Sequence, residues 1–115
     1  MERIVEQGLL YDYYGELLTD HQRKIYEDAV YHDLSLSEIA EGIGISRQGV
    51  HDLIRRCDRI LQEYEEKLHL LEKSVSVRKK AEEISSLTEV RGEAADIDGV
   101  LERIHDLAQS LLEEF

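Results

Sequence analysis

The sequence predicts an all-α protein, and three observations support this class. Proline is absent from all 115 residues, so no residue type here forbids a helix interior. Seven glycines and a single phenylalanine leave a composition that favours helix formers over strand residues. Apolar side chains recur mostly at helical spacing. We expect packing alone to stabilise the fold, because the lone Cys57 has no partner for an intramolecular disulfide.

The first helix is expected over about residues 2–18. Its apolar side chains mostly form one stripe, although Gly8 and Gly15 weaken the helix locally. Tyrosines are concentrated here and in the next helix, where they could stack on single-stranded bases. Because their spacing follows the apolar stripes, core packing is the favoured interpretation for Tyr11, Tyr13, Tyr14, Tyr26 and Tyr31.

Two shorter helices follow, each with a candidate N-cap. Thr19 can cap the second helix, over about 19–32, and Gln22 can reach back to it as in a capping box. The third helix is expected to begin at one of two serines and to end at two glycines: Ser35 or Ser37, and Gly42 and Gly44.

A long fourth helix is expected over about 46–72. Ser46 is a good N-cap, and after Gly49 no residue would stop the helix before Glu72. Apolar positions then alternate by four and three residues, which keeps one seam facing a partner helix: Val50, Ile54, Cys57, Leu61, Tyr64, Leu68 and Leu71.

The rest of the chain is expected to be a helical extension. A weaker helix over about 77–90 is broken by Gly92, and a terminal helix starts at Asp96 or Asp98. The terminal helix has an apolar side and looks like half of a helix pair. The predicted organisation is therefore a helix-turn-helix domain with a long terminal helix at 1–73 and a helical extension at 74–115, a candidate for dimerisation.

Charge is unevenly distributed along the chain. The formal net charge of −12 argues against a protein that covers phosphates with its whole surface. Residues 35–60 hold four basic and four acidic groups, whereas residues 1–34 hold three and eight, and residues 93–115 hold one and seven. Any contact with nucleic acid must therefore be local, near the basic cluster Arg47, Arg55, Arg56 and Arg59.

Residues 36–53 fit the steric demands of a helix-turn-helix. Ala40 supplies a small side chain where two helices cross closely. Gly44 follows four residues later, where the turn needs a positive φ that glycine adopts without penalty. The contacts expected to be buried between the two helices come from Ile39, Ile43, Ile45, Val50 and Leu53.

In such a unit the second helix presents its N-terminal residues to base edges in the major groove. Arg47, His51 and Arg55 recur every four residues and share one face, with Gln48 beside them. Because Arg can bond guanine and Gln can bond adenine, Arg47 and Gln48 are the leading base contacts. The full set of candidate DNA-binding residues adds phosphate contacts and comprises Ser46, Arg47, Gln48, His51, Arg55 and Arg56. Asp52 lies near this surface and costs affinity, and the alternative is that these charges only solvate a helix face.

Other function classes receive little support. The five histidines show no paired spacing typical of a metal site, and the carboxylates accompany no nucleophile motif or phosphate-binding glycine loop, so we expect neither a metal, a cofactor nor an enzyme. No apolar run reaches the length of a membrane span. The N-terminus is charged where a secretory signal would be apolar, which predicts a cytoplasmic protein.

The chain resembles the YlxM family of small bacterial proteins over about residues 2–73. The resemblance rests on Leu18-Thr19 with Gln22-Arg23, Asp33-Leu34-Ser35-Leu36 with Glu38-Ile39-Ala40, Ser46-Arg47-Gln48 with Val50, and Tyr64-Glu65-Glu66-Lys67-Leu68. That family is similar to region 4 of sigma factors in its helix-turn-helix, and its members are typically encoded beside signal recognition particle components. Family members often carry Ala where this chain has Gly49. The resemblance implies a DNA-binding-type regulator connected with protein targeting, and it does not extend to residues 74–115.

Two functional hypotheses follow. The first is a homodimeric helix-turn-helix protein that binds DNA and regulates transcription. The alternative is an adaptor that does not bind DNA, whose acidic surface docks signal recognition particle components.

Overall fold

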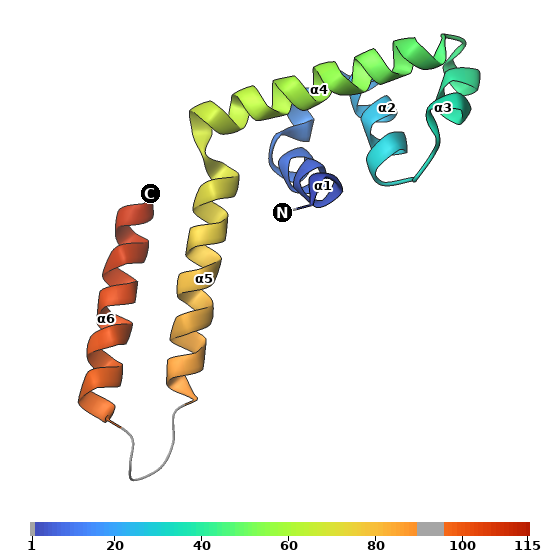
Figure 1. Cartoon of the computed structure of the whole chain (residues 1–115). Helices are drawn as coiled ribbons and strands as arrows, with labels where there is room; N and C mark the ends of the chain where they lie inside the picture. The colour runs from blue at the N-terminus through green and yellow to red at the C-terminus, as the bar shows by residue number, and fades with distance from the viewer. Residues whose placement is uncertain (1, 90–95) are drawn as a thin grey trace. The chain divides into compact units, whose positions relative to one another are not determined.

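The computed structural model describes residues 2–89 and 96–115, and within them all regular structure is helical (Figure 1). The elements are α1 (Arg3–Tyr14), a 3-10 turn η1 (Gly15–Leu17), α2 (Asp20–Val30), α3 (Leu36–Ile43), α4 (Arg47–Leu68), α5 (Leu70–Thr88) and α6 (Ile97–Glu114). The predicted all-α class is confirmed. Contacts group the chain into two compact units, Met1–Leu71 and Glu72–Phe115.

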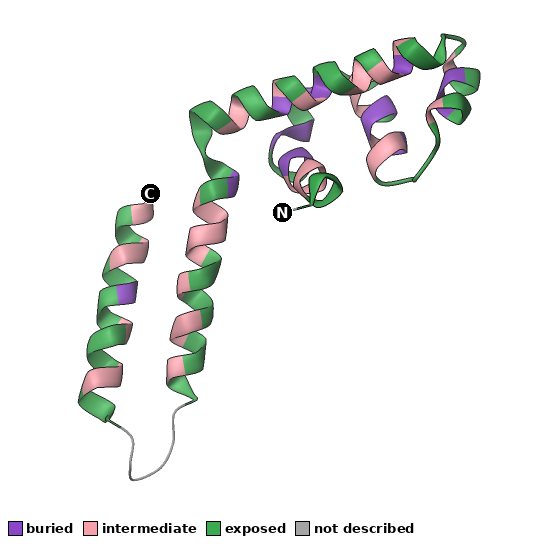
Figure 2. Cartoon of the chain, viewed as in Figure 1, coloured by how far each residue is buried: buried purple, intermediate pink, exposed green. Residues whose placement is uncertain are grey.

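In the first unit, α1, α2 and α3 each contact α4, which carries one side of the core. Figure 2 shows the buried residues of α1 to α4 on the sides that these helices turn to one another. The side chains with the least exposure are Tyr14, Ile25, Tyr26, Val50, Cys57 and Leu61. Burial of this kind is the main stabilising contribution available to a chain whose single cysteine, Cys57, is free.

A polar network around Asp58 joins three helices. The Asp58 carboxylate of α4 accepts a hydrogen bond of 2.6 Å from the hydroxyl of Tyr26 on α2. It also accepts a hydrogen bond of 3.0 Å from the Gln7 amide and lies 3.4 Å from the Arg3 guanidinium, both on α1. Because the Tyr26 ring is fully buried, its hydroxyl depends on Asp58 for a partner.

The first helix ends earlier than predicted, at Tyr14 rather than near residue 18. The chain continues as the 3-10 turn η1, and the Tyr11 ring lies against the backbone of Gly15. A Cβ added at Gly15 would lie 2.7 Å from that ring, so close packing requires glycine there. The prediction that all five tyrosines lie in the core is also wrong in part, because Tyr13 and Tyr31 are exposed.

The two helical glycines of this region are expected to respond oppositely to alanine. Gly8→Ala should raise the free energy of unfolding by about 0.5–1 kcal/mol, because its Cβ would meet nothing closer than the Tyr31 hydroxyl at 3.8 Å. Gly15→Ala should lower it by about 1–3 kcal/mol, because the Tyr11 ring must move. Urea unfolding followed by circular dichroism measures both. A stabilised Gly15→Ala variant would show that helix propensity outweighs the contact.

The predicted capping box of α2 is present, and α3 has a second one. The Thr19 hydroxyl accepts from the Gln22 amide nitrogen at 3.2 Å, and the Gln22 side chain accepts from the Thr19 nitrogen at 3.0 Å. Ser35, rather than Ser37, makes the corresponding pair of bonds with Glu38 at the start of α3. Gly42 does not end α3 as predicted, since it lies inside the helix.

The long fourth helix was predicted to reach about Glu72, but α4 ends at Leu68. His69 adopts a left-handed conformation with φ 56°. The two amides that follow are bound by side chains: the Leu70 nitrogen donates to the Tyr14 hydroxyl at 3.1 Å, and the Leu71 nitrogen donates to the Glu65 carboxylate at 2.9 Å. The Tyr14 contact comes from tertiary packing, which explains why helical periodicity did not mark the break. The predicted seam loses one member, because Leu68 is exposed.

The second unit is an antiparallel pair formed by α5 and α6. Helix α5 begins at Leu70 and not near residue 77, while Asp96 caps α6 as predicted, accepting a hydrogen bond from the Gly99 nitrogen. Ion pairs join the two helices, and the predicted break at Gly92 lies outside the described residues. None of the described helices combines the length and apolar character needed to cross a membrane.

Candidate nucleic-acid interface

The turn between α3 and α4 has the geometry of a helix-turn-helix. Gly44 has φ 74°, in the left-handed region, and its nitrogen donates to the carbonyl oxygen of Ala40 at 2.9 Å. Ser46 caps α4, because its hydroxyl accepts a hydrogen bond of 3.0 Å from the Gly49 nitrogen. The predicted roles of Gly44 and Ser46 are confirmed, and α4 therefore begins at Arg47.

A small core fixes α3 against α4. Ile39 and Ala40 of α3 and Val50 of α4 are buried together with Ile25 of α2. Half-buried apolar side chains surround them: Ala29, Leu36, Ile43, Leu53 and Ile54. Ile45 was predicted to join these contacts but is exposed, because it lies in the turn itself. The support from α2 holds the first turns of α4 at the surface.

The opposite side of α4 carries the candidate DNA-binding residues. Ser46, Arg47 and Gln48 are exposed in the first turn, and Arg55 and Arg56 are exposed two turns later. Within the part of the chain that the structure describes, no carboxylate lies within 4.0 Å of the Arg47, Arg55 or Arg56 guanidinium. Their charge is therefore available to an external anion such as phosphate.

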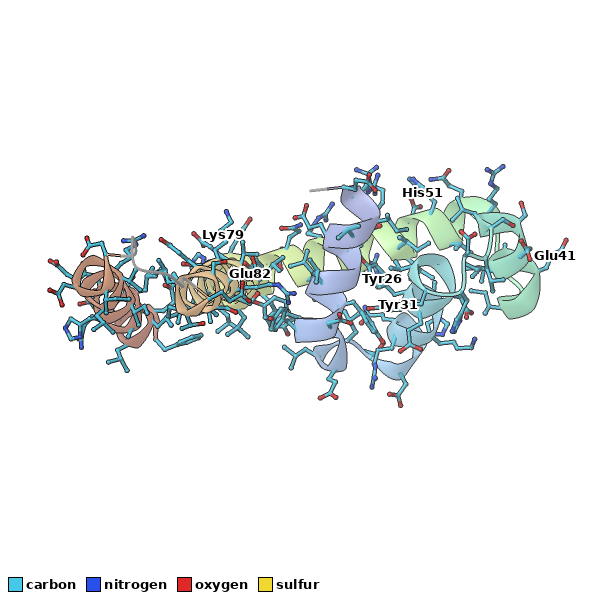
Figure 3. All side chains as sticks on the ribbon, turned by 90° about the horizontal axis from the view of Figure 1, so that it is seen from below. Tyr26, Tyr31, Glu41, His51, Lys79 and Glu82 are labelled. Atoms are coloured by element: carbon cyan, nitrogen blue, oxygen red, sulfur yellow. The ribbon has the colours of Figure 1, made fainter. Side chains whose placement is uncertain are left out.

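Two of the predicted residues are tied to Asp52. The Gln48 amide donates a hydrogen bond of 3.0 Å to the Asp52 carboxylate, and the Nδ1 atom of His51 lies 3.7 Å from the same group. Figure 3 shows the His51 side chain projecting from α4. His51 is half-buried, and its Nδ1 atom is buried without a hydrogen bond to the described residues. For Gln48 to contact a base, its hydrogen bond to Asp52 must first break. This bond is exposed to water and therefore weak.

The structure also brings Leu36 to this site, which sequence reasoning missed. A shallow hollow of about 430 Å³ is lined by Leu36 of α3 and by Arg47, Gln48 and His51 of α4. Only the tertiary approach of the two helices places Leu36 there. Arg59, which the sequence already placed in the basic cluster, is exposed one turn after Arg55 and extends the basic face.

Comparison with known proteins agrees with this geometry. The family model UPF0122, described as "Putative helix-turn-helix protein, YlxM / p13 like", matches residues 1–99. The chain belongs to the UPF0122 family. This family is a helix-turn-helix type and not an enzyme family, and the predicted resemblance to YlxM proteins is confirmed.

Several curated UPF0122 proteins are similar to this chain. One from Caldanaerobacter subterraneus subsp. tengcongensis is 53% identical over 76 residues, which cover 66% of this chain and 65% of the relative. One from Thermoanaerobacter sp. (strain X514) is 40% identical over 105 residues, covering 91% and 90% of the two chains. One from Clostridium botulinum (strain Alaska E43 / Type E3) is 52% identical over 81 residues, covering 69% and 72%.

Proposed function

We propose that the chain binds duplex DNA through the first three turns of α4 and regulates transcription in the cytoplasm. The observation that carries this proposal is the exposed pair Arg47 and Arg55, which share one face of the second helix of a helix-turn-helix and form no ion pair with described residues. Arg47 and Gln48 contact bases, whereas Ser46, Arg55 and Arg56 contact phosphates. His51 lies beside Arg47 in the same hollow and helps to position its side chain.

Charge restricts this binding to one surface. Residues 35–60 are electrically balanced, while the flanking segments carry most of the net charge of −12. Affinity for arbitrary DNA is then low at physiological salt, because few phosphates are neutralised and the rest of the surface repels DNA. Recognition must depend on specific base contacts.

The proposal is tested by selecting sequences from a genomic DNA pool with the full chain. Arg47→Ala combined with Gln48→Ala should abolish enrichment of the selected sequences and weaken their binding roughly 10- to 100-fold, because two base contacts are lost. Arg55→Ala combined with Arg56→Ala should instead weaken binding to all sequences and lower the salt dependence.

Lys79→Ala is the matched control, because it removes an exposed positive charge of α5 without touching α4. It should leave enrichment and affinity unchanged. Enrichment that survives in the Arg47→Ala/Gln48→Ala variant would reject the base-reading role of these residues. Absence of any enrichment by the wild-type chain would reject DNA binding.

A second candidate is an adaptor that docks signal recognition particle components. Asp52 favours the adaptor, because this exposed carboxylate lies among the candidate DNA-binding residues of α4 and would repel DNA. The net charge of −12 and the resemblance described above point the same way. A pull-down with purified particle protein and receptor at moderate salt tests it, and recovery of neither would count against the adaptor.

A further inference from the structure

Helix α6 turns one narrow side toward α5. Arg103 bonds Glu83 at 2.8 Å, and Glu114 bonds Lys80 at 2.7 Å. Leu107 is buried in the same pair of helices. At about 100° per residue, Arg103, Leu107 and Glu114 fall within an arc of roughly 40° on α6. This arc marks the side that α5 covers.

A second apolar stripe lies elsewhere on α6. Ile97, Leu101 and Leu112 are 54%, 58% and 75% exposed, and they fall within an arc of roughly 60°. This arc lies about 100–160° around the helix from the side that α5 covers. Half-buried apolar residues fill the sector between the two arcs: Val100, Ile104 and Leu111. So wide an apolar sector is typical of a helix with more than one neighbour, and the described part of this unit supplies one.

Helix α5 extends the same face. Helical periodicity in an antiparallel pair places Val77, Ala81 and Ile84 beside the exposed stripe of α6. Two helices about 27 Å long give this face an area of several hundred Å², which approaches the roughly 800 Å² that each partner contributes to a standard interface. Monomeric proteins rarely expose an apolar patch of this size.

The charges at the edges of the face indicate its occupant. Asp98, Glu102 and Glu113 line the outer edge of α6, whereas Arg78 at the outer edge of α5 forms an ion pair of 3.1 Å with Glu82 through its Nε atom. A two-fold arrangement that sets α6 on its own copy would bring the acidic edges together. One that sets α6 on α5 of the other copy instead brings each acidic edge to this neutral pair, whose guanidinium has further N–H donors for a carboxylate of the partner. The second arrangement therefore avoids the repulsion that the first would create.

We propose that a second copy of the chain covers this face, so that two α5–α6 pairs form a four-helix bundle with α6 of each copy against α5 of the other. The inference goes beyond DNA binding and does not depend on it. Light scattering of the full chain at micromolar concentration should give twice the mass of one 13.3 kDa chain. Leu101→Gln combined with Leu112→Gln should raise the dissociation constant more than roughly 100-fold, because four apolar side chains leave the interface.

Ile4→Gln combined with Val5→Gln is the matched control, because both residues are exposed on α1. This variant should remain dimeric, and circular dichroism should show unchanged helicity in both variants. A monomeric wild-type chain, or an Leu101→Gln/Leu112→Gln variant that stays dimeric, would overturn the proposal. A chain that selects DNA but is monomeric would reject the dimer and leave the proposed function standing.

Charge reversal tests the arrangement within the dimer. Arg78→Glu alone, or Asp98→Lys with Glu102→Lys, should each weaken the homodimer roughly 2- to 10-fold, because like charges then face each other. Mixing the two variant chains should restore wild-type affinity as a heterodimer. A tighter homodimer of the Asp98→Lys/Glu102→Lys variant, in which acidic repulsion is relieved, would show that α6 packs on α6 and would overturn the arrangement.

Discussion

Replacing Asp58 with alanine is expected to lower the free energy of unfolding by about 2–3 kcal/mol. The change leaves the Tyr26 hydroxyl, which belongs to a fully buried side chain, without its hydrogen-bond acceptor. It also removes the partner of the Gln7 amide and of the Arg3 guanidinium. Three helices lose their shared polar contact. The expected decrease is therefore a large part of the total free energy of unfolding of such a small unit. Urea unfolding followed by circular dichroism measures it.

Asp52→Ala is the matched control on the same helix. Its carboxylate is exposed and accepts a single hydrogen bond from Gln48, so the variant should differ from the wild type by less than about 0.5 kcal/mol. Tyr26→Phe should cost about 1 kcal/mol, because it removes one bond and leaves Asp58 with two partners. Equal losses in Asp58→Ala and Asp52→Ala would contradict the structural role of the network.

Stability is also expected to fall steeply in alkali. Burial raises the pKa of Tyr26 above its usual value, and the hydrogen bond to Asp58 raises it further. Burial together with the Glu65 carboxylate raises the pKa of Tyr14 in the same direction. In the unfolded chain both tyrosines ionise near their ordinary pKa of about 10, whereas in the folded chain each ionises at a higher pH.

Above that pH the unfolded state binds fewer protons than the folded state, so the free energy of unfolding decreases as pH rises. We expect a loss of about 1–3 kcal/mol between pH 9 and pH 11. The loss between pH 7 and pH 9 should be smaller and come from the Cys57 thiol, whose pKa is also raised by burial. Urea unfolding at these three pH values measures the loss. Tyr26→Phe should show a shallower decline. A free energy of unfolding that stays constant up to pH 11 would show that Tyr14 and Tyr26 ionise as readily in the folded chain as in the unfolded chain.

Burial also protects Cys57 from reaction. It raises the pKa of the thiol to about 11, with the nearby Asp58 carboxylate adding to the effect. Because the thiolate is the reactive form, the native chain should react with a thiol reagent at pH 8 more than roughly 10-fold more slowly than the chain in urea. Absorbance of the released chromophore checks this, and equal rates would show that α4 opens readily.

Local chemistry explains which features could be predicted. Thr19, Ser35, Ser46 and Asp96 cap helices where their side chains meet free backbone amides within three residues, which is a property of short stretches of sequence. Gly44 occupies the left-handed position of the turn for a similarly local reason. The candidate arginines were placed correctly on an exposed face because helical periodicity assigns residues to faces.

Errors arose where distant residues compete with local preference. Nothing near His69 predicts a left-handed residue, and the break is stabilised by the Tyr14 hydroxyl, more than fifty residues away in sequence. The end of α1 at Tyr14 differs, because the Tyr11 ring that lies against Gly15 is only four residues away in sequence.

By itself, the sequence determined the helical class, the caps, the helix-turn-helix and the basic face of α4, because each depends on residues within one or two turns of one another. Only the tertiary structure decided where α4 ends, that Asp58 joins three helices, that Leu36 borders the candidate interface and that α6 carries a second apolar stripe. These features depend on which surfaces meet, and that is set by the free energy of packing the whole chain.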